Sequence, residues 1–99
     1  MVTKIEWRKK ALRFVEEKAI YLETEFSEQT AINFVSRIEK TIEKVAKNPK
    51  SYRKVVLAKS VYFINIDKQN QMFYRVAGDT LIISAFFDMR QDPKKRPFK

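Results

Sequence analysis

The sequence contains no cysteine and no histidine, and among its 99 residues are only one glycine and three prolines. Without cysteine the chain has neither a disulfide framework nor a thiolate zinc site, and without histidine it lacks the usual side chain for proton transfer near neutral pH. No apolar run approaches the roughly 18 residues of a membrane span, and residues 1–7 are too polar for a secretory signal. We therefore expect a cytoplasmic protein with no metal, no cofactor and no membrane partner.

Positive charge is what the sequence has in excess, with 21 lysines and arginines against 12 acidic residues and a net charge of +9. The excess is uneven, because residues 1–48 carry 10 basic and 8 acidic side chains whereas residues 49–99 carry 11 basic and 4 acidic ones. Such a field attracts polyanions and acidic partners at long range. A basic surface that only keeps a small protein soluble is the simpler alternative.

In the first half of the chain, the spacing between apolar residues changes once, from every second position to every third or fourth. Alternation over residues 2–7 predicts a strand with Val2, Ile5 and Trp7 towards the core. From about Arg8 the apolar residues recur every three or four positions, which predicts an antiparallel helical hairpin. Ser27 is the expected N-cap of its second helix, and Asn48-Pro49 the expected end. The two apolar stripes are Leu12, Val15, Ala19, Leu22 and Phe26, then Ala31, Phe34, Val35, Ile38, Ile42 and Val45.

The second half reads as a meander of strands. Residues 55–87 are rich in valine, isoleucine, tyrosine and phenylalanine, and turn signals at 67–70 and 78–79 divide them. We predict antiparallel strands near 60–66, 71–77 and 80–87, with Gly78 at positive φ in a tight hairpin. The fold class is then α+β, in the order β-α-α-β-β-β, with the helical hairpin packed on a small antiparallel sheet. Residues 92–99 form a charged, basic tail that is prone to fray.

Two stretches carry a family resemblance: Met-Phe-Tyr-Arg-Val-Ala-Gly-Asp-Thr-Leu-Ile-Ile at 72–83 and Phe-Phe-Asp-Met-Arg-Gln-Asp-Pro at 86–93. They resemble toxins of the RelE/ParE superfamily, in which a tyrosine-rich strand, a turn, an aliphatic strand and a terminal arginine motif follow one another. The second helix, closing at Ala46-Lys47-Asn48-Pro49, is similar to the same family. The resemblance implies that residues 1–99 are a single toxin domain of a type II toxin–antitoxin module, which arrests growth and is held inactive by an acidic cognate antitoxin.

Two targets divide this superfamily. RelE-like members cut messenger RNA in the ribosomal A site, and ParE-like members poison DNA gyrase without being nucleases. We favour RNA cleavage as the first hypothesis from the sequence, with gyrase inhibition as the alternative. The resemblance then implies phosphate binding by Arg90 and a catalytic basic cluster at Lys54 and Lys59. A solvated edge of the sheet is the alternative for each of these lysines. The nucleic-acid-binding residues that we predict are Arg53, Arg75, Lys94 and Lys95.

The departures from the family pattern leave other interpretations open. The tail lacks the tyrosine or histidine of the well-characterised nucleases, so no residue is assigned as general acid or general base. Arg90 could instead pair with Asp88 or Asp92 and hold the tail, and Arg75 could pack its stem along apolar surface. A toxin relic without catalysis therefore remains an alternative. So does a basic RNA-binding module whose sheet shows Tyr62, Phe73 and Tyr74.

Overall fold

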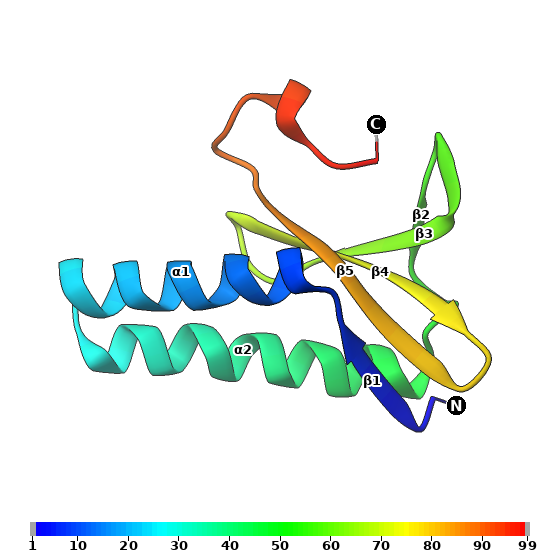
Figure 1. Ribbon diagram of the computed structural model, residues 1–99, viewed down its shortest axis with the longest axis horizontal. Helices are drawn as coiled ribbons and strands as arrows, with labels where there is room; N and C mark the ends of the chain where they lie inside the picture. The colour runs from blue at the N-terminus through cyan, green and yellow to red at the C-terminus, as the bar shows by residue number, and fades with distance from the viewer. Residues whose placement is uncertain (1, 99) are drawn as a thin grey trace.

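The protein is described by a computed structural model that covers residues 2–98. It places two helices on one face of a five-stranded sheet, with the C-terminal segment on the other (Figure 1). The α+β class, the helical hairpin and the three-stranded meander are confirmed. In chain order the elements are β1 (Lys4–Trp7), α1 (Lys9–Glu25), α2 (Glu28–Lys47), β2 (Arg53–Val55), β3 (Ala58–Asn65), β4 (Asn70–Ala77), β5 (Thr80–Asp88) and the short 3₁₀ helix η1 (Pro93–Lys95).

The sheet has the strand order β1-β5-β4-β3-β2. Its last four strands pair antiparallel, but β1 lies parallel to β5, with Lys4 opposite Thr80 and Trp7 opposite Ile83. The sheet is therefore mixed, which corrects the purely antiparallel sheet expected from the sequence. A parallel neighbour needs a long crossover, and the helical hairpin belongs to the segment that separates β1 from β5. Strand β2 was not predicted, because three residues are too few to show a period.

Local signals set the helix and hairpin ends as the sequence predicted. Ser27 is the N-cap of α2, and its Oγ accepts a hydrogen bond of 3.1 Å from the backbone N–H of Thr30. The helix ends at Lys47 with Asn48 as its C-cap, directly before Pro49. Gly78 has φ +60° in the turn between β4 and β5, where a side chain would strain the backbone. Within residues 2–98, neither helix is long and apolar enough to cross a membrane.

The main core lies between the helices and the sheet. The predicted stripe of α2 is largely correct, since four of its members are buried: Ala31, Phe34, Ile38 and Val45. The stripe of α1 is partly wrong, because Leu12 and Phe26 are 43% and 65% exposed while Ala11 is buried. Helix α1 packs mainly on α2 and β5, so it buries a narrower face, rotated from the predicted one. In the first strand, Val2 is buried but Ile5 is exposed.

A second apolar cluster occupies the opposite face of the sheet, and the C-terminal segment covers it (Figure 1). We call residues 92–98 the tail and this face of the sheet the tail face. Phe98 packs on Phe73 with ring centroids 5.7 Å apart. The tail was expected to fray, but it packs on the sheet as far as residue 98, and residue 99 lies outside the described part. The buried residues of this cluster are Val55, Val61, Phe73, Ala85 and Phe87.

The Tyr74 hydroxyl ties β4 to the segment that follows α2. Its Oη donates a hydrogen bond of 2.6 Å to the carbonyl oxygen of Pro49, and the residue is fully buried. We predict that Tyr74→Phe lowers the free energy of unfolding by about 1–3 kcal/mol, because it leaves a carbonyl without its donor. Urea unfolding followed by circular dichroism measures this. Tyr21→Phe removes the same atom from an exposed ring and should change little, and equal stability of the two variants would contradict the prediction.

Candidate functional site

The carboxylate of Asp88, the last residue of β5, holds two cations. Its side chain is 8% exposed, and its Oδ2 lies 2.7 Å from the Lys18 Nζ and 2.8 Å from an Nη of Arg90. The backbone N–H and the Nε–H of Arg90 both donate to the other oxygen, at 2.9 and 3.1 Å. The Arg90 side chain is nevertheless 60% exposed. Asp88 thus fixes one side of this guanidinium and leaves the rest open to solvent.

A line of polar contacts connects this group to the other helix. Lys18 also donates to the Oδ1 of Asn70 at 3.2 Å, and the Asn70 amide donates to Asp67 at 3.1 Å. Asp67 in turn lies 3.4 Å from an Nη of Arg37 on α2. The contacts join α1, β5, β4, the turn before β4 and α2. No group of His, Cys, Asp and Glu within residues 2–98 is arranged to hold a metal ion.

The pKa of the Asp88 carboxyl is held far below its ordinary value of 3.8, first by the Arg90 hydrogen bond and then by Lys18, against the opposing effect of burial. The same contact raises the pKa of Arg90. Because the folded pKa of Asp88 is the lower one, its contribution to stability is present above the ordinary value. It is lost as the pH falls towards the folded pKa.

We predict that the free energy of unfolding falls as the pH is lowered from about 5 to 2, and that Asp88→Asn flattens this dependence. At pH 7 the variant should be less stable by about 3 kcal/mol, because Lys18 is left as a largely buried charge without its partner. Denaturant unfolding at several pH values measures both effects. The control is Asp92→Asn at an exposed position, where asparagine also caps η1. An acid slope in Asp88→Asn equal to that of the wild type would refute the assignment.

A second group of cations lies on the tail face, where Arg96 is at its centre. The guanidinium carbon of Arg96 lies 5.0 Å from the ring centroid of Phe63 and 5.1 Å from that of Phe73. Its Nε–H donates to the Oε1 of Gln71 at 3.2 Å. A guanidinium over aromatic rings gains a cation–π attraction that strengthens as water is excluded. Arg96 therefore fastens the tail to β3 and β4.

Arg75 and Phe98 make a further contact on the tail face. The Arg75 guanidinium carbon lies 6.0 Å from the Phe98 ring centroid. Phe98 has φ +59°, a left-handed backbone that costs a side-chain-bearing residue energy unless its packing compensates. Its ring supplies that compensation through Phe73 and Arg75. Arg75 itself is exposed, with its guanidinium beside this aromatic ring.

The predicted catalytic residues stand in three different places. The Lys54 Nζ lies 5.6 Å from the ring centroid of Tyr62, on the face that the helices cover. Lys59 is an exposed residue near the start of β3, where the pairing with β2 is irregular because Lys54 lies opposite Tyr62 but Val55 lies opposite Ala58. Arg90 follows β5, separated from β3 by β4. Strand β4 therefore lies between Arg90 and the two strands that carry the lysines.

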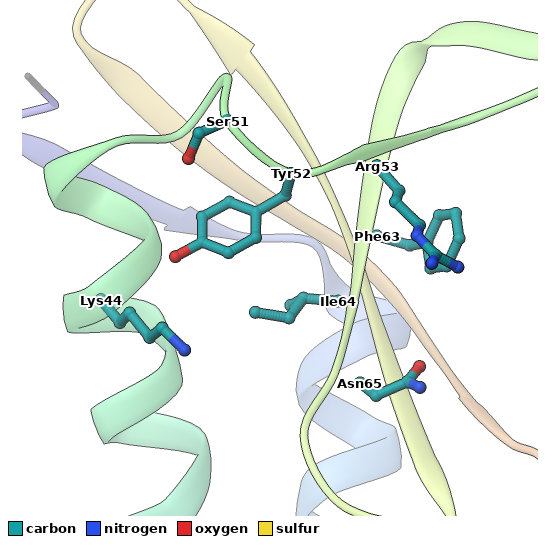
Figure 2. Close-up of a pocket in the computed structure, with 7 residues that line it drawn as sticks. All are labelled: Lys44, Ser51, Tyr52, Arg53, Phe63, Ile64 and Asn65. Atoms are coloured by element: carbon teal, nitrogen blue, oxygen red, sulfur yellow. The ribbon is translucent and has the colours of Figure 1, made fainter.

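The predicted nucleic-acid-binding residues are also divided. Arg53 and Arg75 belong to the tail face, where Arg53 lines a hollow with Tyr52 (Figure 2). Lys94 is exposed on η1, and Lys95 lines another hollow beside α1. Arg53 and Arg75 thus belong to two strands of the sheet, and Lys94 and Lys95 belong to the tail.

Two residues that contribute most to these groups were missed by the sequence reasoning. Lys18 interrupts the apolar stripe of α1 between Val15 and Leu22, and a charged residue in such a stripe signals a buried partner. Arg96 stands two residues before Phe98, a spacing that fits a tail reaching one face of a sheet. Neither signal names the partner, because Asp88 is 70 positions from Lys18 and Gln71 is 25 positions from Arg96.

The helical hairpin on a five-stranded sheet, with an arginine just past the last strand, defines the class of RelE/ParE-like folds. The chain matches, over residues 5–93, the family described as the ParE toxin of the type II toxin–antitoxin system parDE. It belongs to this family and is the toxin component of a type II toxin–antitoxin module. Membership implies an antitoxin as partner. No curated protein sequence matches the chain.

Solved structures share this fold at low sequence identity. The chromosomal ParDE system from P. aeruginosa has a TM-score of 0.74 at 12% identity, over 88% of this chain and 96% of that one. A YoeB/ParE toxin from Agrobacterium tumefaciens gives 0.65 at 13%, over 87% and 98%. The YoeB dimer from Staphylococcus aureus gives 0.62 at 13%, over 88% and 97%. At these identities the likeness is one of fold.

Proposed function

We propose that this toxin arrests growth by inhibiting DNA gyrase and that it does not cleave RNA. The observation that carries the proposal is that the tail covers the buried apolar side chains of the tail face. The sequence favoured RNA cleavage, with gyrase inhibition as the alternative. The arrangement of the side chains supports the alternative, and we adopt it in this proposal.

RNA cleavage needs three chemical roles at one phosphate. A base must remove the proton of the 2′-hydroxyl, a cation must stabilise the added negative charge, and an acid must protonate the leaving oxygen. Lys54 lies on β2 and Lys59 near the start of β3, whereas Arg90 lies past β5 beside α1, and β4 separates β3 from β5. The chain has no histidine to serve as the acid or base. The residues named for a nuclease are therefore not assembled into one.

Two cations of the tail face, Arg96 and Arg75, have intramolecular partners. Arg96 lies over two phenylalanine rings and bonds to Gln71, and Arg75 lies over Phe98. A bound RNA strand on this face would have to displace the tail and separate these contacts. The tail face therefore supports a structural role better than a substrate-binding one.

Arg90 suits recognition of a protein target. Its guanidinium is fixed by Asp88 yet mostly exposed, so little conformational entropy is lost when it binds. Tyr21, which is 52% exposed, lines the same shallow hollow of about 300 Å³ as Arg90. Arginine and tyrosine are enriched among the residues that dominate protein interfaces. We assign this hollow to the contact with gyrase.

We predict that the purified protein inhibits supercoiling of relaxed plasmid by DNA gyrase, and that Arg90→Ala needs about tenfold more protein for the same inhibition. Lys59→Ala, which removes an exposed cation on another strand, serves as the matched control and should inhibit like the wild type. Circular dichroism confirms that both variants are folded. Unchanged inhibition by Arg90→Ala would remove this residue from the proposed contact.

The same preparation tests the absence of nuclease activity. Programmed ribosomes with messenger RNA in the A site should yield intact message after incubation with the wild-type protein, as read by primer extension. Message cut at the A site, together with normal gyrase supercoiling, would overturn the proposal in favour of the RelE-like function.

A further inference from the structure

The turn between β2 and β3 exposes two large aliphatic side chains. Val56 is 82% and Leu57 is 77% exposed, which makes them the most exposed of the large hydrophobic residues in the described chain. Two-residue hairpin loops usually contain glycine, asparagine or aspartate, whose backbones adopt the required conformations. Valine and leucine bring no such advantage and place apolar surface in water. Local structure therefore does not explain these residues, whereas contact with a partner does.

Positive charge surrounds this turn without any carboxylate. Residues 44–66 contain six basic side chains and no acidic one: Lys44, Lys47, Lys50, Arg53, Lys54 and Lys59. The charge of this stretch supplies most of the net +9 of the chain. A ligand for this region must therefore carry negative charge as well as apolar surface.

Two adjoining hollows, of about 550 and 610 Å³, lie beside β2 and share Arg53 and Phe63. Figure 2 shows the first, in which the Tyr52 ring and Ile64 lie between Lys44 and Arg53. The second is lined by the turn and by the tail: Lys54, Val55, Val56, Leu57, Arg96 and Phe98. Both hollows are lined by aromatic or aliphatic side chains together with cations. We call the two hollows and the turn together the tip surface.

Strand β2 also offers hydrogen-bonding groups. It is the last strand of the sheet, and within residues 2–98 no strand pairs with its outer side. Free N–H and C=O groups along an edge strand bind an extended peptide well. An extended segment laid along β2 would meet both hollows and the turn.

We propose that the tip surface receives an extended, acidic segment of the cognate antitoxin that carries at least one large apolar side chain. The family implies an antitoxin, but neither family nor fold says where on this chain it binds. Ile20 and Phe26 are also exposed, but glutamates follow them closely in the sequence, at positions 23, 25 and 28, and would repel an acidic segment. Charge therefore distinguishes the β2–β3 turn from these two residues. The proposal goes beyond the gyrase contact and does not depend on it.

The test measures binding of the antitoxin encoded beside this toxin to toxin variants by isothermal titration calorimetry. Val56→Ser combined with Leu57→Ser should weaken binding about tenfold or more, because the complex loses two apolar side chains that it would otherwise bury. Since both residues are exposed in the free toxin, the fold should be retained, and thermal unfolding checks this. The matched control is Ile20→Ser combined with Phe26→Ser, at two positions of the helical hairpin that are each 65% exposed. This variant should bind as the wild type does.

Charge is tested by a second pair of variants. Arg53→Glu combined with Lys54→Glu should weaken binding and reduce its dependence on salt. Lys9→Glu combined with Lys10→Glu makes the same charge change on α1 and should leave affinity within about twofold of the wild type. Equal weakening in both variants would mean that only net charge matters and would overturn the assignment of the tip surface.

Growth experiments separate the antitoxin surface from the target. The Val56→Ser, Leu57→Ser toxin should arrest growth as the wild type does, but co-expression of the antitoxin should no longer restore growth. Wild-type affinity of the serine variant for the antitoxin would overturn the proposal. Loss of growth arrest with antitoxin binding intact would also overturn it, since the turn would then contact the target. None of these outcomes depends on whether the target is gyrase.

Discussion

Burial of β4 on both of its faces is the constraint on which the rest of the structure depends. All five residues from Asn70 to Tyr74 are buried, with the helical hairpin on one side and the tail on the other (Figure 1). A strand covered on both faces needs apolar or fully bonded side chains at every position. Phe73 and Tyr74 meet this by packing, and Asn70 and Gln71 by hydrogen bonds. The tail is thus part of the fold.

The same constraint decides which chemistry the sheet can support. A nuclease acting on the tail face would need an open surface with several cations and a proton donor close together. Here Arg96 and Phe98 pack over Phe63 and Phe73 on that surface. Arg90 with Asp88 lies at one border, beside α1, and the basic, apolar turn of β2 and β3 lies at another. Both border positions suit contacts with proteins, as the proposed inhibition of gyrase and the binding of an antitoxin require.

Much of the fold could be predicted because its determinants are local. Ser27, Gly78 and Asn48-Pro49 act through the backbone within a few residues, so their roles were correctly predicted. The partner of β1 and the buried face of α1 depend on packing between distant segments, and sequence period gives no information on either. In the candidate site, the pairing of Arg90 with Asp88 was foreseen as an alternative because the two are close in sequence. Lys18 and Arg96 were missed because their partners are remote.

The most direct test of the central claim is made in cells, soon after induction of the toxin without its antitoxin. Chromosome integrity is followed by pulsed-field electrophoresis while the 5′ ends of messenger RNA are sequenced in the same culture. Inhibition of gyrase that traps its cleaved-DNA state predicts broken chromosomes and messages whose ends match those of the uninduced culture. Intact chromosomes, with new message ends at fixed positions within codons, would contradict the claim.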